Sequence, residues 1–249
     1  MPSTNTWLLA HCKEETYPNL FTVYTYRQTA GRGQAGNAWE SEPGKNLSFS
    51  TLFHLRSAEQ ASRLNLLVPL AIVEAMDSTD VTLSIKWPND IYFGDKKLGG
   101  ILIENVFIGS RAAFAVAGIG LNINQELFVS DAPNPVSFRQ ITGTTYDLDA
   151  LLDRIVEHMG ARLSLLDDYT SLKQAYMARL YRRAGFFPYV ERDVSTAPTT
   201  IADAAAISAD THQPFLAEIA DIDPYGRLVL RRTDGTVSTY HFKQIRFVL

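Results

Sequence analysis

The sequence contains very few of the residues on which disulfide and zinc scaffolds depend. Its only cysteine among 249 residues is Cys12, so the chain cannot form an intramolecular disulfide. This excludes the small disulfide-stapled domains and fits a reducing compartment. The five histidines do not have the spacing of zinc ligands, so no structural metal site is expected from the protein's own side chains.

Positive charge is also scarce. The 23 Lys and Arg residues are outnumbered by 27 Asp and Glu residues, which gives a formal net charge of −4 and a pI near 5.7. Broad DNA binding requires a concentrated basic surface. The charge balance therefore argues against a nucleic-acid partner, although it leaves room for one local anion site.

Long apolar runs are missing too. No stretch approaches the roughly 20 apolar residues of a membrane span, and the most apolar segment, 64–76, is interrupted by Pro69 and Glu74. Residues 1–9 lack the basic and apolar regions of a signal peptide. With a mean hydropathy of −0.07, these features predict a soluble, cytoplasmic protein that has no membrane partner.

Residue patterns up to about position 185 predict a mixed α/β part. Helical periodicity and capping residues predict helices that begin at 3–5 and span 58–76, 149–166 and 171–184, the last ending at Gly185. Alternating apolar and β-branched residues predict strands over 20–26, 46–55, 81–86 and 112–121, and a hairpin that joins 91–93 to 101–103 around Gly94-Asp95. The polar, Pro-rich stretch 125–145 is expected to be a long functional loop.

After Pro188 the pattern becomes entirely β-like. Short strands are expected over 215–222, 227–232 and 237–242, separated by turns at 223–226 and 234–235. We therefore expect two domains, residues 1–185 and residues 186–249, the second being a small all-β barrel.

A glycine-rich loop follows the first predicted strand. Residues 31–36, Gly-Arg-Gly-Gln-Ala-Gly, satisfy the G-x-G-x-x-G pattern, but a dinucleotide site also needs a helix directly after it. Here Pro43-Gly44 and a strand follow, which disfavours that interpretation. Arg32 between two glycines is able to clamp a phosphate or a carboxylate. From the loop alone, a solvated flexible turn is an equally good interpretation.

Two further motifs bring lysines to the predicted hairpin. The block Lys86-Trp87-Pro88-Asn89-Asp90 delivers a cation, an amide and a carboxylate at a strand end, although by itself it reads best as an ordinary surface turn. Residues 97–100, Lys-Leu-Gly-Gly, place a second lysine across the hairpin, beside glycines that allow close approach of a ligand.

The strand 112–121 contains glycines and leads into amides. Gly118 and Gly120 precede Asn122, whose amide suits the edge of a base or a cyclic urea; a tight strand exit is the alternative. Glu104 is expected either to face outward or to pair with one of the lysines. The chain has no G-x-S-x-G and no P-loop motif. Lys, Arg and Gly are suited instead to transfer at a phosphorus or carboxyl centre through positioning and charge stabilisation.

Together these motifs resemble the biotin protein ligase family. The resemblance rests on Ser3-Thr4-Asn5, Gln28 with Gly31-Arg32-Gly33 and Trp39, the block 86–90, Lys97 with Gly100, and Gly118-x-Gly120-x-Asn122, all in the same order. It implies an α/β (α+β) catalytic domain related to class II aminoacyl-tRNA synthetases. Such a domain has a mixed, mainly antiparallel sheet with flanking helices, followed by a small SH3-like β-barrel. The length implies the short form of the family, without an N-terminal DNA-binding domain.

The resemblance also implies a two-step reaction. The biotin carboxylate attacks the α-phosphorus of ATP to give biotinyl-5′-AMP and pyrophosphate, and a lysine of a biotin carboxyl carrier protein then attacks the mixed anhydride. ATP, with Mg²⁺, would be the cofactor, biotin the substrate and the carrier domain the protein partner. The chain would act as a monomer or a homodimer.

Site residues are carried over from the same motifs. Biotin would be bound by Ser3, Thr4, Asn5, Gln28, Gly31, Arg32, Gly33, Lys97, Gly100, Gly118 and Gly120. The adenylate would be bound by Arg32, Gln34, Trp39, Asn89, Lys97 and Asn122. The catalytic residues would be Arg32, Lys86, Asp90 and Lys97. Asp90 would orient the carrier lysine or accept its proton, and Lys86 would support Asp90.

Two alternatives stay open at this point. A lipoate-protein ligase shares the adenylation chemistry, although the Gly-Arg-Gly loop and the block 86–90 favour biotin. The other alternative is a non-catalytic biotin-binding module. As a repressor, such a module would need a helix-turn-helix ahead of Ser3.

Overall fold

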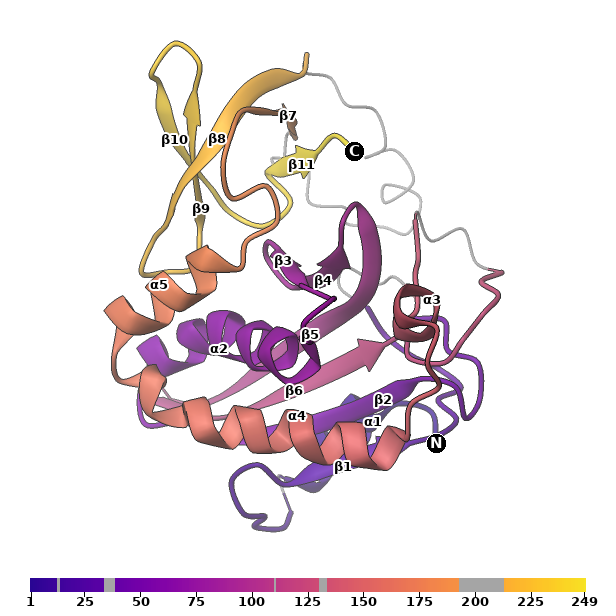
Figure 1. Ribbon diagram of the computed structural model, residues 1–249. Coiled ribbons are helices and arrows are strands. Elements are labelled where there is room, and N and C mark those ends of the chain that lie inside the picture. Colours follow the sequence, from indigo (N-terminus) through magenta and orange to yellow (C-terminus); the bar gives the residue numbers. More distant parts are fainter. Residues whose placement is uncertain (13, 34–38, 110, 130–133, 193–212) are drawn as a thin grey trace, which may run out of the picture. The chain divides into compact units, whose positions relative to one another are not determined.

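The computed structural model describes residues 1–12, 14–33, 39–109, 111–129, 134–192 and 213–249. The chain divides into two compact units, Met1–Tyr181 and Arg182–Leu249 (Figure 1). Among the helices in the described ranges, none combines the length and the apolar character needed to cross a membrane.

The first unit is built on a six-stranded sheet in the order β1-β2-β6-β5-β4-β3. All five neighbouring pairs are antiparallel. The strands are β1 (Thr22–Thr25), β2 (Leu47–His54), β3 (Ser84–Lys86), β4 (Asp90–Phe93), β5 (Lys96–Ile108) and β6 (Arg111–Leu121). The predicted hairpin around Gly94 is confirmed, and this glycine has the positive φ of +53° that a tight turn favours.

In the described ranges of this unit, five α-helices and one 3₁₀ turn accompany the sheet. They are α1 (Thr4–His11), α2 (Ala58–Met76), α3 (Phe138–Thr142), α4 (Leu148–Arg162), the 3₁₀ turn Leu163–Leu166 and α5 (Tyr169–Ala178). The sequence prediction of α2 is confirmed at both ends, with the Ser57 side chain accepting a hydrogen bond from the backbone N–H of Gln60. Ser3 caps α1 in the same way, through the N–H of Thr6.

The two faces of the sheet are covered differently. Helix α2 packs against one face, with α4 beside it, whereas α1 packs against the other face (Figure 1). On the α1 side Leu8 meets Leu52 of β2 and Val116 of β6. Side chains alternate between faces along a strand. Residues two and four positions away, Ser48 and Gly120 among them, therefore also lie on the face that carries α1.

Two predictions from the sequence are corrected in this unit. The stretch 125–145 is not one loop, because Ser137 and Gln140 form a capping box that starts the short helix α3. Helix α5 ends at Ala178 and not at 184. The backbone that follows hydrogen-bonds to Ile85 of β3, through the carbonyl of Arg179 and the N–H of Tyr181, and this pairing stops the helix.

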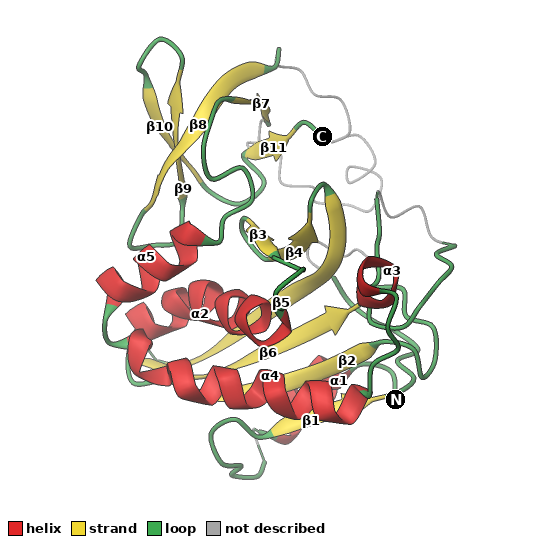
Figure 2. Ribbon diagram, in the orientation of Figure 1, coloured by secondary structure: helices red, strands yellow, loops and turns green. Residues whose placement is uncertain are grey.

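The second unit contains an antiparallel sheet in the order β10-β9-β8-β7-β11 (Figure 2). The strands are β7 (Phe187–Glu191), β8 (Phe215–Ile222), β9 (Leu228–Arg232), β10 (Val237–Tyr240) and β11 (Ile245–Phe247). Strands β8, β9 and β10 were predicted; β7 and β11 are short and were missed. In the part of this unit that the structure describes, no pairing joins β10 to β11, so the sheet is open and does not form the expected closed barrel.

Candidate functional site

Two glycines of β6 form the floor of the site. In the ladder between β2 and β6, Gly120 faces Ser48 and Gly118 faces Ser50. A Cβ atom on Gly118 would lie 2.6 Å from Oδ1 of Asn5, and one on Gly120 would lie 2.4 Å from Cε2 of Trp39. Because such distances are far below van der Waals contact, only glycine lets the Asn5 and Trp39 side chains lie directly on the sheet.

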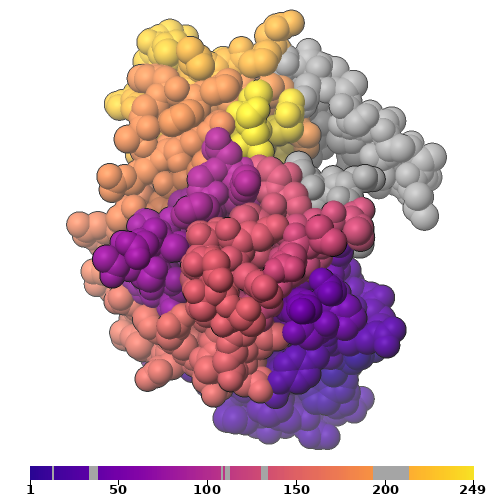
Figure 3. Space-filling model, turned by 45° about the vertical axis from the view of Figure 1, so that its right-hand side comes forward, coloured from indigo at the N-terminus to yellow at the C-terminus, as the bar shows by residue number. Residues whose placement is uncertain are grey.

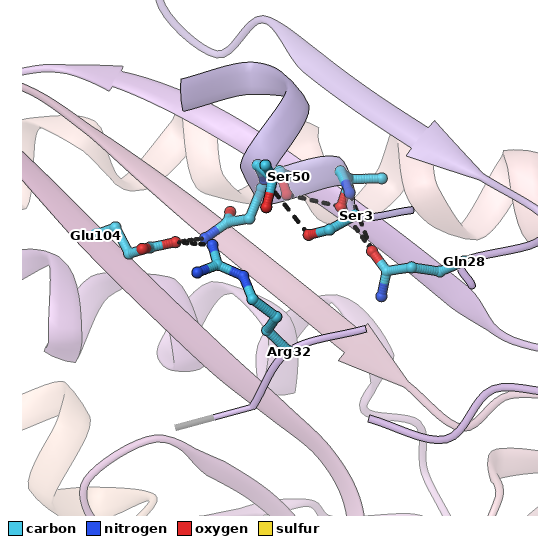
Figure 4. Close-up of polar contacts among 8 residues, drawn as sticks. Ser3, Gln28, Arg32, Ser50 and Glu104 are labelled. Carbon is cyan, nitrogen blue, oxygen red and sulfur yellow. Dashed lines mark hydrogen bonds and ion pairs between the residues drawn. The ribbon is translucent and has the colours of Figure 1, made fainter. Parts of the chain in front are cut away.

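The N-terminus of α1 brings polar groups to the edge of this floor (Figure 4). The backbone N–H and the hydroxyl of Thr4 donate to Oε1 of Gln28, at 3.0 and 3.4 Å. The Ser50 hydroxyl donates to Oγ1 of Thr4 at 2.8 Å. The structure thus brings together the predicted head-group residues Ser3, Thr4, Asn5 and Gln28, although Gln28 comes from a different part of the chain.

Three buried polar atoms beside the floor have no hydrogen-bond partner among the described residues: Oδ1 of Asn5, Oγ of Ser48 and Nε1 of Trp39. Asn5 is 5% exposed and Ser48 is 2% exposed. A buried polar group without a partner costs about 1–3 kcal/mol. An acceptor, a hydroxyl and an N–H donor in one place suit a ligand that carries both N–H groups and a carbonyl oxygen.

Ser48 was not among the residues predicted from the sequence. The only indication in the sequence was that Ser48 stands between two apolar residues, Leu47 and Phe49. The structure shows that its position in β2 is buried. A buried serine is usually paired with a backbone group, so this observation pointed to no ligand until the register placed Ser48 opposite Gly120.

Lys97 and Asp90 form an ion pair at one end of the floor. Nζ of Lys97 lies 2.7 Å from Oδ1 of Asp90 and 5.9 Å from the centre of the Trp39 ring. Gly100 faces Asp90 across the β4–β5 ladder and Gly120 across the β5–β6 ladder. This register joins the ion pair to the glycine floor.

Lys86 lies directly opposite Asp90 in the β3–β4 ladder. Its ammonium group donates to the hydroxyl of Tyr92 at 3.0 Å and lies 4.7 Å from the centre of that ring. Burial, followed by the charge of Asp90, raises the pKa of the Tyr92 hydroxyl, so Tyr92 stays a neutral phenol at physiological pH. Sequence patterns did not identify Tyr92, because only the strand register places it beside the lysine.

Arg32 pairs with Glu104 of β5. Its guanidinium donates to Oε2 of Glu104 at 2.8 Å, and the same oxygen accepts a hydrogen bond from Nδ2 of Asn5 at 2.5 Å (Figure 4). This corrects the expectation for Glu104, whose observed partners are the loop arginine and Asn5. The carboxylate lies on the same face as Gly100, four residues earlier, because the strand alternates in steps of two.

The loop that carries Arg32, the arginine loop (residues 31–33), is hydrogen-bonded to Trp39. The backbone N–H of Trp39 donates to the Gly31 carbonyl at 3.1 Å. A Cβ atom on Gly31 would lie 2.7 Å from Nε2 of Gln28, so this glycine lets the loop approach Gln28 closely. Gly33 follows Arg32 in the described segment. The predicted adenylate residue Gln34 lies outside the described residues.

Asn89 and Asn122 use their amide groups within the protein. Nδ2 of Asn89 donates to the carbonyl of Ile101. Nδ2 of Asn122 donates to the carbonyl of Val136 at 3.3 Å, and the main-chain carbonyl of Asn122 accepts from the N–H of Phe138 at 2.9 Å. The structure therefore gives both residues a role in holding loops beside the site, and their contact with an adenylate stays a prediction.

The segments on either side of the site are joined by a buried glutamine, Gln125, which is 2% exposed. The Gln125 side chain accepts hydrogen bonds from Nδ2 of Asn46 and from the N–H of Glu42. Figure 3 accordingly shows the N-terminal segments, in indigo to violet, beside the pink segment that follows β6. This link holds residues 42–46 next to the end of the strand that carries the glycine floor.

No group of three or more His, Cys, Asp or Glu side chains in the described ranges is placed to hold a metal ion. The positive charges of the site come from Arg32, Lys86 and Lys97. Arg32 and Lys97 are each paired with a carboxylate. An anionic ligand would therefore meet two cations that are already paired, Arg32 with Glu104 and Lys97 with Asp90.

Comparison with known proteins identifies the family. Residues 1–122 match the model of the biotin/lipoate A/B protein ligase family, and this range contains every site residue that was predicted from the sequence. The chain is 32% identical over 168 residues to the bifunctional ligase/repressor BirA of Salmonella typhimurium, covering 66% of this chain and 52% of the relative. It is 29% identical over 169 residues to the biotin–[acetyl-CoA-carboxylase] ligase of Paracoccus denitrificans, covering 64% and 70%.

The chain spans about half the length of the BirA relatives that it matches. Among solved structures, the biotin protein ligase of Aquifex aeolicus in complex with biotin and ATP superposes with a TM-score of 0.73 at 21% identity, over 99% of this chain and 95% of the other. At this identity the likeness shows a common fold. The matched motifs, the fold and the glycine-floored site agree, and residues 1–122 belong to the biotin/lipoate A/B protein ligase family.

Proposed function

We propose that the chain is an ATP-dependent ligase that activates biotin as biotinyl-5′-AMP and transfers the biotinyl group to a lysine of a biotin carboxyl carrier protein domain. Family membership supports this proposal, as do the names of the relatives. The observation that carries it is the set of unsatisfied buried atoms, Oδ1 of Asn5, Oγ of Ser48 and Nε1 of Trp39, over the glycine floor.

The head group of biotin suits these atoms. Its cyclic urea offers N–H donors and one carbonyl acceptor, and Asn5 supplies the complementary acceptor while Trp39 supplies a donor. Ser48 is able to donate or to accept. Gly118 and Gly120 would line the pocket indirectly, because the Asn5 and Trp39 side chains lie on them. Ser3, Thr4, Gln28, Gly31 and Gly33 would border the head group.

The first step joins two anions, the biotin carboxylate and the phosphates of ATP. A carboxylate oxygen forms a bond to the α-phosphorus, the bond from that phosphorus to the oxygen bridging to the β-phosphorus breaks, and pyrophosphate leaves with the electron pair. Arg32 and Lys97 would offset the negative charge that builds up as the anions approach. The ion pairs with Glu104 and Asp90 hold both cations in place before the substrates bind.

The second step transfers the biotinyl group. The carrier lysine amine attacks the carbonyl carbon of the anhydride, the bond from that carbon to the phosphate oxygen breaks, and AMP leaves. The nitrogen must lose a proton. Asp90 would orient this amine or accept the proton, and Lys86, directly opposite it, would support Asp90.

Mg²⁺ would reach the site on the phosphate oxygens of ATP, where it neutralises negative charge. Trp39, Asn89 and Asn122, together with Gln34, would border the adenylate. The C-terminal unit would correspond to the SH3-like domain of the family, with the catalytic domain assigned to residues 1–185 and the β domain to residues 186–249. A monomeric or homodimeric state also remains a prediction.

Biotin-dependent exchange of radiolabelled pyrophosphate into ATP tests the first step. We expect exchange with biotin and at least 10-fold less with lipoate at the same concentration. Lys97→Ala, which removes a proposed charge-stabilising group, is expected to lose exchange. Absence of exchange with biotin in the wild-type chain would overturn the proposal, and exchange with lipoate alone would make the chain a lipoate ligase.

A further inference from the structure

One carboxylate oxygen connects the arginine loop to α1. Oε2 of Glu104 accepts hydrogen bonds from Nδ2 of Asn5 at 2.5 Å and from the Arg32 guanidinium at 2.8 Å (Figure 4). The three residues come from different elements, because Asn5 lies in α1, Arg32 in the loop after β1 and Glu104 in β5. A carboxylate oxygen can accept two such bonds at once.

The carboxylate determines which way the Asn5 amide points. If the amide were rotated by half a turn, its Oδ1 would take the place of Nδ2, 2.5 Å from another acceptor, and the two oxygens would repel. Nδ2 therefore faces Glu104. As a consequence Oδ1 is directed over Gly118, where a Cβ atom would be only 2.6 Å away and where no described group donates to it.

We propose that Glu104 is a positioning residue that fixes the Asn5 amide so that the site presents a hydrogen-bond acceptor over Gly118 to an N–H group of its ligand. Naming that ligand as biotin rests on the proposed function; the orientation of the amide does not. In this arrangement the Arg32 ion pair and the polarity of the head-group pocket depend on the same carboxylate.

The arrangement makes a specific prediction about coupling. If the carboxylate served only to hold Arg32, its removal would lower the biotin affinity by the same factor whether or not Asn5 were present. If the carboxylate orients Asn5, its removal should no longer change the biotin affinity once the Asn5 amide has been removed. A double-mutant cycle between Glu104 and Asn5 separates the two roles.

The experiment is biotin titration by calorimetry on the full chain, with Glu104→Ala, Glu104→Gln, Asn5→Ala and the double variant N5A/E104A. Glu104→Ala is expected to weaken biotin binding about 10-fold, which is the equivalent of one oriented hydrogen bond. The double variant should bind biotin as weakly as Asn5→Ala alone. Glu104→Gln, whose carbonyl oxygen still accepts from Nδ2, should lie within about 3-fold of the wild type.

Glu74→Ala is the matched control, because the Glu74 carboxylate also pairs with an arginine, Arg162, at 2.9 Å, but on the helix layer. It should leave biotin binding unchanged. If Glu104→Ala does not fold, Glu104→Leu fills the same space and also removes the acceptor. The thermal unfolding temperature of each variant is measured as well, so that a loss of affinity caused by misfolding is recognised.

The side-chain amide signals of Asn5 in a ¹⁵N NMR spectrum provide a readout that needs no ligand. They are expected to shift in Glu104→Ala and to stay near their wild-type positions in Glu104→Gln. Unchanged signals in Glu104→Ala would overturn the inference, as would an equal loss of biotin affinity in the wild-type and Asn5→Ala backgrounds. If the wild-type chain binds no biotin, the proposed function fails, while the NMR result still decides the orientation of the amide.

Discussion

Nζ of Lys97 lies 2.7 Å from Oδ1 of Asp90, across the hairpin of β4 and β5. The contact places a proton acceptor beside a cation, and both lie over Gly100, where a Cβ atom would be 3.4 Å from Oδ1 of Asp90 and 3.5 Å from Nζ of Lys97. The two groups proposed for the two reaction steps are therefore in direct contact. Their roles can be separated only by measuring each step by itself.

Asp90→Asn keeps the size of the side chain but cannot accept a proton. We expect transfer of the biotinyl group to the carrier lysine to fall at least 100-fold, the lower end of the contribution of a general base. Biotin-dependent pyrophosphate exchange should fall less than 10-fold. Single-turnover transfer from preformed biotinyl-5′-AMP, measured beside exchange, checks this. Equal losses in both steps would show that Asp90 acts only by holding Lys97.

Alanine at Gly118 or Gly120 should disrupt the site. The added Cβ would lie 2.6 Å from Oδ1 of Asn5 in one case and 2.4 Å from the Trp39 ring in the other. Overpacking of this kind costs about 1–3 kcal/mol, and we expect biotin affinity to fall at least 10-fold in both variants, measured by calorimetry. Gly100→Ala is the control for stability, because its nearest neighbour would be 3.4 Å away. A loss of unfolding free energy in Gly100→Ala as large as in the other two would contradict the steric argument.

Ser48→Ala and Ser50→Ala should change stability in opposite directions. The Ser48 hydroxyl is buried without a partner, whereas the Ser50 hydroxyl donates to Thr4 at 2.8 Å. We expect the free energy of unfolding without ligand to rise by about 1 kcal/mol in Ser48→Ala and to fall by about 1 kcal/mol in Ser50→Ala. Urea denaturation measures both. Biotin binding should nevertheless weaken in Ser48→Ala, and a variant that was less stable without ligand would contradict this assignment.

The hydrogen bond between Tyr26 and Asp149 is expected to make the stability of the protein fall at high pH. Its hydroxyl donates to both carboxylate oxygens of Asp149, at 2.7 and 2.8 Å, and this hydrogen bond raises the pKa of Tyr26 to about 12. Because the folded-state pKa lies above the ordinary value of 10, the stabilisation is complete below pH 10 and is lost as the pH rises towards 12. Tyr26→Phe should therefore be less stable than the wild type at pH 8, and the difference should shrink as the pH approaches 12. A difference that does not change with pH would refute this.

Local patterns predicted most of the first unit correctly. The caps of α1 and α2 and the turn at Gly94 depend on interactions between residues a few positions apart, which a sequence displays directly. The end of α5 was predicted wrongly because its stop comes from backbone pairing with Ile85, almost a hundred residues earlier. Strands β7 and β11 were missed because they pair with each other across more than fifty residues of sequence, with Ile245 facing Glu191, and no local turn signal joins them.

The sequence by itself determined the order of the motifs, the residue types of the site and the family that they resemble. The tertiary structure decided which of these residues meet. The contacts of Glu104 with Asn5 and Arg32 span 99 and 72 residues, and the position of Ser48 opposite Gly120 follows from strand register. Register depends on the pairing of whole strands and on the burial of one sheet face, so no local stretch of sequence contains these contacts.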